Sequence, residues 1–227
     1  MIPDRKRAFG DVADSRSASV GRWLVLAGVL SSIGFVSAWT LAGVLRPGYS
    51  QIQQPISDLG VGPFGWLIDS LGGLDGLLKI GYAIGFALVT KRWVGSGWRL
   101  TSAGLLILAS LTTLVVASFT DAPATVRIHS LATMVGITSR LLAMITVGAG
   151  FLATAGLRSW GVYSVLMAIL TLALGAAEFA VFSPASPLSS AHVGGLAERI
   201  FVIAVESWYV ALGLRLFTLA PVQETDE

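Results

Sequence analysis

Long apolar stretches, each bounded by charged or turn-forming residues, are the feature that most limits how this chain can fold. The first runs from about Arg22 to Leu45 and has no charged residue between its ends. A helix needs roughly 20 mainly apolar residues to cross the ~30 Å hydrocarbon core of a bilayer. Similar stretches recur along the chain, and they predict six membrane-spanning helices at about 22–45, 74–92, 98–119, 125–154, 159–183 and 195–219.

The composition agrees with a membrane protein rather than a soluble one. Of the 227 residues, 12% are charged and 54% are hydrophobic, and the mean hydropathy is +0.77. Soluble domains carry about a quarter charged residues. The net charge of +2 is too small to indicate a nucleic-acid partner, so none is expected. The expected fold class is therefore an all-α bundle of six transmembrane helices.

Six spans put both termini on one side of the membrane, and the basic residues indicate which side. Ten Lys and Arg residues lie on the side of the termini, against three on the other, which are Arg46, Arg127 and Arg199. Because Lys and Arg favour cytoplasmic segments, we expect cytoplasmic termini. We expect residues 1–21 to form a disordered cytoplasmic tail, 22–219 a single six-span membrane domain, and 220–227 a short acidic tail.

The second span is the least regular of the six. The segment Trp66–Leu71 is amphipathic, and Gly72-Gly73 separates it from the apolar run that follows Asp75. Glycine weakens a helix interior by about 1 kcal/mol relative to alanine. The pattern predicts a short interfacial helix, a break at Gly72-Gly73, and then the span itself.

Side chains capable of binding or catalysis collect in the loops on the side opposite the termini. The longest polar interruption, from Arg46 to Gly65, is rich in turn residues and hydrogen-bonding side chains. We expect it to cap a polar, outward-facing site that binds a lipid headgroup or a small polar ligand. The residues expected to form this site are Arg46, Tyr49, Ser57, Asp58, Asp121, His129, His192, Glu198 and Arg199.

Roles within this site follow from the chemistry of the side chains. Arg46, Arg199 and Arg127 would meet an anionic group, because Arg pairs bidentately with phosphate or carboxylate. Asp58, Asp121 and His129 would orient the ligand or move a proton. The expected partner is a membrane lipid or a small polar molecule, while the sequence leaves any oligomer or protein partner open.

A membrane-embedded hydrolase acting on a lipid is an alternative function. His129, Asp121 and Ser57 are the candidate catalytic residues, in the manner of a Ser-His-Asp group, or His129, His192 and Asp121 could surround a metal. The chain has no cysteine and two histidines, and their spacing is not a known ligand signature. We therefore expect no metal and no other cofactor.

Two charged residues lie near the middle of predicted spans. An unpaired charge at that depth costs about 3 kcal/mol or more, so Arg140 and Glu206 are expected to pair, directly or through water. Lys79 and Glu178 are the next candidates for the same network. These residues could instead serve a small-solute transporter, although we find no internal repeat of the kind that transporters often show. A non-catalytic assembly partner is a further alternative.

Three motifs resemble the DUF998 family of bacterial and archaeal membrane proteins. They are Arg46-Pro-Gly-Tyr-Ser with Ile56-Ser-Asp-Leu-Gly60, then Asp121 with His129, and then Gly195-Leu-Ala-Glu198-Arg199. The resemblance covers roughly residues 22–218. It implies six spans in a prokaryotic cell membrane but no activity. The Ser-Asp-Leu-Gly segment is also distantly similar to the Frag1/DRAM/Sfk1 group of six-span proteins, which are connected with lipid handling.

Overall fold

The computed structural model describes the chain over residues 5–63 and 65–219, and its side chains from residue 17 onward. Every described element is helical, which confirms the all-α fold class. The elements are α1 (Arg5–Leu45), η1 (Ile56–Gly60), α2 (Gly65–Val89), η2 (Thr90–Arg92), α3 (Ser96–Ser118), α4 (Val126–Leu152), α5 (Arg158–Phe182), η3 (Pro187–Ala191) and α6 (Gly194–Leu219), where η marks a 3-10 helix.

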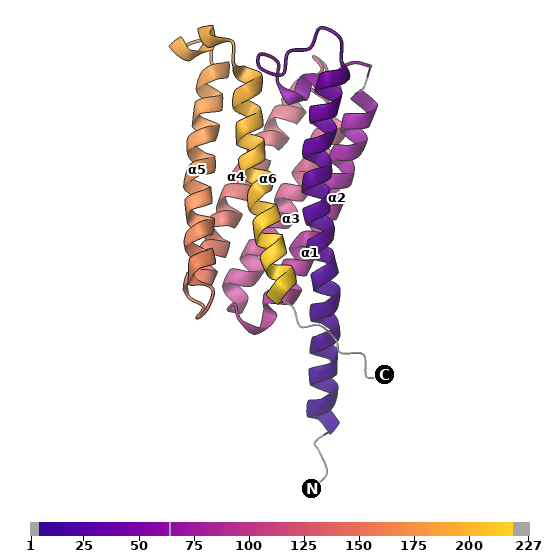
Figure 1. Cartoon of the computed structure of the whole chain (residues 1–227), viewed down its shortest axis with the longest axis vertical. Helices are drawn as coiled ribbons and strands as arrows, with labels where there is room; N and C mark the ends of the chain where they lie inside the picture. Colours follow the sequence, from indigo (N-terminus) through magenta and orange to yellow (C-terminus); the bar gives the residue numbers. More distant parts are fainter. Residues whose placement is uncertain (1–4, 64, 220–227) are drawn as a thin grey trace.

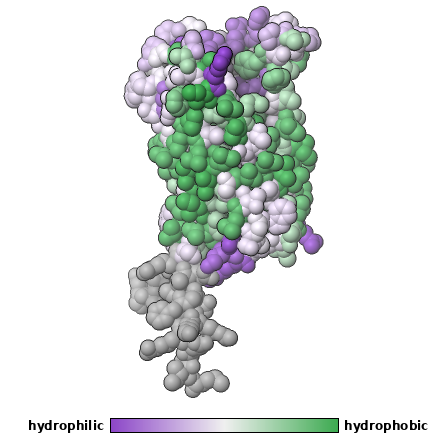
Figure 2. Space-filling model, turned by 180° about the vertical axis from the view of Figure 1, so that it is seen from behind, coloured by the Kyte–Doolittle hydropathy of each residue, from purple (hydrophilic) through white to green (hydrophobic). Residues whose placement is uncertain are grey.

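All six α-helices are long and apolar enough to cross a membrane, which identifies a polytopic membrane protein. The predicted bounds of the third, fifth and sixth spans lie within two residues of those of α3, α5 and α6. An apolar band lies between two more polar ends of the bundle (Figure 2). The exposed apolar side chains of this band are those expected to face lipid.

Two sequence-based expectations about α1 and α2 are wrong. Helix α1 begins at Arg5, so residues 5–21 are helical rather than disordered, and the apolar span continues an existing helix from Ser17. Helix α2 is continuous through Gly72-Gly73, so Trp66–Leu71 belongs to the span and not to a separate interfacial helix. Gly72 faces Ala117 of α3, and such small residues support close helix packing in membranes. Residues 1–4 and 220–227 lie outside the described residues.

The six helices form a ring in chain order. Each helix packs on the next one along the chain, α6 returns to pack on α1, and α2 also contacts α6 across the ring. The first and last helices run to the same end of the bundle, as six spans require (Figure 1). We call this the terminal end, and we call the opposite end, with the loops after α1, α3 and α5, the loop end. That the terminal end is cytoplasmic stays a prediction.

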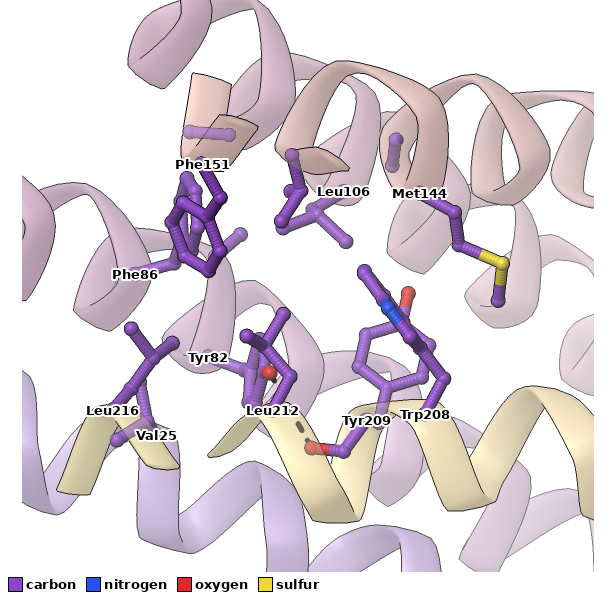
Figure 3. Close-up of a cluster of buried hydrophobic side chains, with 14 of the residues drawn as sticks. Val25, Tyr82, Phe86, Leu106, Met144, Phe151, Trp208, Tyr209, Leu212 and Leu216 are labelled. Atoms are coloured by element: carbon purple, nitrogen blue, oxygen red, sulfur yellow. Dashed lines mark hydrogen bonds between the residues drawn. The ribbon is translucent and has the colours of Figure 1, made fainter. Parts of the chain in front are cut away.

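The half of the bundle toward the terminal end is filled by large side chains. Tyr82, Phe86, Phe151, Trp208 and Tyr209 are fully buried there and pack against one another (Figure 3). The Tyr82 hydroxyl donates to the backbone carbonyl of Tyr209 at 3.3 Å, and the indole N–H of Trp208 donates to Ser164 Oγ at 3.2 Å. The buried hydroxyl of Tyr209 has no hydrogen-bond partner among the described residues. Together these five large side chains close the ring of helices as a solid core.

Glycines let α1 and α2 approach closely in the same half. A Cβ atom placed on Gly85 of α2 would lie 2.7 Å from the backbone oxygen of Gly21 of α1. Small residues at such contacts allow the backbones of membrane helices to pack directly. This contact holds the first hairpin together beside the aromatic core.

Candidate functional site

The first loop, residues 46–63, folds back over the loop end and is held there by α6. Gly195 and Leu196, at the start of α6, donate their backbone N–H groups to the carbonyls of Gln53 and Ile52 at 3.2 and 2.9 Å. These N–H groups have no partner inside their own helix. The first turn of α6 thus serves as the docking point for the loop.

Arg199 fastens the same contact. Its guanidinium donates to the carbonyl of Gln54 at 3.0 Å and to the hydroxyl of Tyr49 at 2.6 Å, and only 5% of the residue is exposed. The Tyr49 hydroxyl in turn donates to the carbonyl of Pro55 at 2.7 Å, and burial raises the pKa of this phenol above its ordinary value. Arg199 and Tyr49 therefore hold the loop against α6.

Arg46 and Asp58 are joined by a hydrogen bond within the first loop. Arg46 donates to the backbone carbonyl of Asp58 at 2.5 Å, which braces the loop from its first residue. The Asp58 side chain is partly buried, and this burial, followed by the negative charge of Asp121, raises the pKa of its carboxyl group. Neither residue lines the cavity described next. That Arg46 and Arg199 meet an anion stays a prediction.

Beneath the first loop the ring encloses a cavity of about 500 Å³ at the loop end. All six helices and the loop contribute to its wall. Four carboxyl side chains line it, from α2, the loop before α4, α5 and α6. They are Asp69, Asp121, Glu178 and Glu198.

No Lys or Arg lines this cavity among the described residues. The only basic side chain in its wall is His129, whose Nδ1 lies 2.9 Å from the backbone oxygen of Phe119. Because a carbonyl oxygen can only accept, Nδ1 carries the hydrogen in this contact. Glu198 accepts a hydrogen bond from the backbone N–H of Ile56, so one of the four carboxylates also anchors the first loop. The cavity is therefore acidic.

The remaining wall is mostly apolar. Phe35 of α1 and Phe182 of α5 contribute aromatic rings, and Ile68, Val116, Met134 and Val202 contribute aliphatic and thioether surface. Deep pockets of this kind, apolar with a few convergent polar groups, are typical of sites for small ligands. Their polar groups determine which ligands can bind.

A second, smaller cavity of about 150 Å³ continues the first toward the middle of the bundle. The two share part of their lining, including Phe35, Thr133, Glu178 and Glu198. The deeper cavity adds three charged residues near the centres of their helices, namely Asp75, Arg140 and Glu206. A polar path thus runs from the loop end to about mid-span, where the aromatic core begins.

The charges at mid-span pair differently from the sequence-based expectation. Glu206 is bound to Lys79, with its two carboxylate oxygens 2.6 and 2.7 Å from Nζ, and Lys79 also contacts Asp75 Oδ2 at 2.8 Å. Arg140 instead donates to Thr113 Oγ1 on α3. Among the described residues no direct ion pair joins Arg140 to Glu206, and their predicted pairing through water stays a prediction, whereas Lys79 does belong to the network. A helical stripe shows which face a charge lies on, but not which helix lies opposite.

The arrangement needed for a hydrolase is not assembled. Ser57, Asp121 and His129 line the same cavity, but the hydroxyl of Ser57 donates to Asp121 at 3.2 Å, and His129 is directed to a backbone carbonyl. A nucleophilic serine needs the imidazole as its acceptor. Among the described residues no three His, Asp or Glu side chains are close enough together to hold a metal ion. The exposed His192 ends η3 outside the cavity.

Sequence reasoning overlooked part of the cavity wall. Asp69 was not expected in the site, and Asp75 was not recognised as a partner of Lys79. The spacing of Asp75 and Lys79, i and i+4 on one helix, is a known ion-pair spacing and was a usable signal. Phe35 and Phe182 had no such signal, because aromatic residues in a span are ordinarily packing or lipid-facing residues.

Comparison with known proteins supplies a family but no activity. The family model described as a protein of unknown function, DUF998, matches residues 25–215. No curated protein and no solved structure matches the chain. The likeness of the Ser57–Gly60 segment to the Frag1/DRAM/Sfk1 group stays a prediction. Since the matched region covers nearly all of the six-helix bundle, the chain belongs to the DUF998 family of membrane proteins.

Proposed function

We propose that the loop-end cavity binds the positively charged group of a small organic molecule or lipid headgroup, such as a primary amine or a quaternary ammonium. The observation that carries this proposal is the charge of the wall. Asp69, Asp121, Glu178 and Glu198 line the cavity, and within the described residues no Lys or Arg does. A cation would gain charge-assisted contacts here, whereas an anion would meet repulsion.

The apolar part of the wall favours an organic cation over a hydrated metal ion. A carbon-bound ammonium group brings its own apolar surface, which Phe35, Phe182 and Met134 can cover. Aromatic faces also attract quaternary ammonium groups by about 0.5–2 kcal/mol each. The volume of about 500 Å³ lies within the range of ligand pockets.

Soluble probes test this proposal directly. The protein is placed in nanodiscs of a glycerol-headgroup lipid, which offers no amine, and its thermal unfolding is followed with added tetramethylammonium, ethylammonium or sulfate as matched sodium or chloride salts. A ligand that binds the folded state raises its unfolding temperature. We expect stabilisation by the two cations and none by sulfate.

Two variants locate the binding. Glu178 has no ion-pair partner among the described residues and lines both cavities. Glu178→Gln should weaken cation binding by about tenfold, or ~1.4 kcal/mol. Asp58→Asn, which removes a carboxylate at the same end but outside the cavity wall, should leave the affinity unchanged. Stabilisation by sulfate alone, or equal affinity in wild type and Glu178→Gln, would overturn the proposal.

Transport of the bound cation is a second candidate function. The specific observation in its favour is the deeper cavity, which continues the first one to Asp75, Arg140 and Glu206 at mid-span. Transport would require the aromatic core to open, because Tyr82, Phe86 and Trp208 fill the ring beyond this point. Uptake of a radiolabelled cation into proteoliposomes, lost in Glu206→Gln while cation binding persists, would support transport. Binding without any uptake would exclude it.

A further inference from the structure

We propose that the loop-end cavity opens sideways to the bilayer between α4 and α5 and takes its ammonium group from a phospholipid of the surrounding leaflet. This inference rests on the proposed function and names the source of the ligand. It predicts that the headgroup enters the acidic cavity while the acyl chains stay among the lipids. Three features of α4 and α5 support it: their packing, the cavity rim, and the position of Arg127.

The two helices pack closely only toward the terminal end. A Cβ atom on Gly161 of α5 would lie 2.7 Å from the backbone nitrogen of Leu152, and one on Gly148 of α4 would lie 2.7 Å from Val165. The buried residues of α5 end at Thr171, so none of residues 172–182 is buried. On α4, the buried residues likewise concentrate from Ser139 onward. The helices are therefore joined at one end and open along the other.

The rim of the cavity lies in this open part. Met134 of α4 and Phe182 of α5 both line the cavity, yet 59% and 45% of their surfaces are exposed. Met134 stands eight residues from the first residue of α4, or about 12 Å along the helix axis at 1.5 Å per residue. A side chain at this depth that is both cavity-lining and exposed faces lipid rather than water. The mouth is thus lateral.

The residues around the mouth suit a phospholipid. Leu131 and Phe179 flank it with exposed apolar surface, where acyl chains would lie. Arg127 is exposed in the first turn of α4, and it shares a helix face with Ser130 and Met134 at i, i+3 and i+7. This places a guanidinium near the end of α4, at the depth of lipid phosphates and about two turns from Met134. A phosphate on Arg127 and an ammonium near Glu178 would together hold a zwitterionic headgroup.

A pair of photoactivatable lipids tests the inference. Both carry the same diazirine-bearing acyl chains, one with an ethanolamine headgroup and one with a glycerol headgroup. Each is incorporated into nanodiscs with the full-length protein, and the labelled peptides are mapped by mass spectrometry. We expect the ethanolamine lipid to label residues 130–134 and 179–182 about fivefold more than the glycerol lipid does, reflecting its charge-assisted contacts. At Leu30, an exposed position on α1, the two lipids should label equally.

Variants distinguish a lipid whose headgroup enters the cavity through the lateral mouth from a lipid that only covers the surface of the bundle. Glu178→Gln and Arg127→Gln should each bring the labelling ratio at the mouth close to one. Met134→Trp should narrow the mouth and lower labelling, whereas Leu142→Trp, at an exposed position on the same helix but away from the mouth and outside the cavity lining, should not. If soluble ammonium ions bind but the two lipids label every position equally, the lateral mouth between α4 and α5 is overturned and the proposed function stands. If neither soluble ammonium nor the ethanolamine lipid is selected, both proposals fall.

Discussion

The two halves of the bundle differ in what fills the ring. Toward the terminal end, Phe86, Phe151, Trp208 and Tyr209 close the space completely, and the indole N–H of Trp208 is bound to Ser164 inside the protein. Toward the loop end, the same six helices surround a cavity with four carboxylates in its wall. The first half maximises packing. The second half is less tightly packed and contains a cavity whose four carboxyl groups have no Lys or Arg beside them in the described wall, a departure from ideal packing that is common at functional sites.

The largest expected effect concerns the boundary between the two halves. Lys79→Met should lower the free energy of unfolding by about 5 kcal/mol, because it leaves Asp75 and Glu206 buried without their cation. Unfolding in a mixed-micelle denaturant series would measure this loss. The double variant Lys79→Met/Glu206→Gln should regain part of it, since one stranded charge is removed. Equal stability of Lys79→Met and wild type would show that the network is not a structural boundary.

Two phenylalanine substitutions, one in each half, test the difference in packing between the two halves. Phe151→Ala in the solid half should cost about 3–4 kcal/mol, because it removes a fully buried ring and leaves a cavity. Phe182→Ala removes the same atoms from the cavity rim, which is 45% exposed, and should cost about 1 kcal/mol or less. The same unfolding assay compares them. Similar losses for the two variants would contradict the division into a solid and a hollow half.

The cap over the cavity should depend on the fork geometry of Arg199. Arg199→Lys keeps the charge but cannot reach Gln54 and Tyr49 together, so the local stability of the first loop should fall by about 1–3 kcal/mol. Faster amide hydrogen exchange over residues 50–60 would report this change. Arg127→Lys, at an exposed position, is the matched control and should leave that exchange unaltered.

The smallest expected effect is a pH dependence in the loop end. Burial and the charge of Asp121 raise the pKa of Asp58 in the folded protein above its ordinary value of 3.8. The folded state therefore holds this proton more tightly, so the stabilisation is present below pH 3.8 and is lost as pH rises through the raised pKa. Melting temperatures of wild type and Asp58→Asn across this interval should converge at low pH and separate above it, with the variant more stable. A constant difference at all pH values would contradict the assignment.

Local sequence patterns predicted the spans well, because apolar length is a property of each segment alone. Helix α5 was expected at 159–183 and lies at Arg158–Phe182. The break expected at Gly72-Gly73 failed for a nonlocal reason: α3 packs against that face of α2 and supports a continuous helix. The helical start of α1 was missed because a polar segment carries no apolar signal, although it continues directly into a span.

The site was harder to predict because it depends on which helices are neighbours. Arg199 and Glu198 are adjacent in sequence and both bind the loop backbone, yet Glu198 lines the cavity and Arg199 does not. Helical spacing showed that they lie on different faces, but not what stands opposite each face. The closing of the ring by α1 and α6 supplies that information. Ser57, Asp121 and His129 all line the cavity, although Ser57 donates to Asp121 and not to His129.

The hydrogen bonds between the first loop and α6 also constrain the order in which the protein can be completed during synthesis. Residues 46–63 leave the ribosome well before the sixth helix, yet the backbone carbonyls of Ile52, Gln53 and Gln54 accept hydrogen bonds from Leu196, Gly195 and Arg199 of that helix. Until that last span is inserted, the loop lacks these contacts and the ring lacks its closing helix. The acidic cavity is therefore complete only after α6 has been inserted.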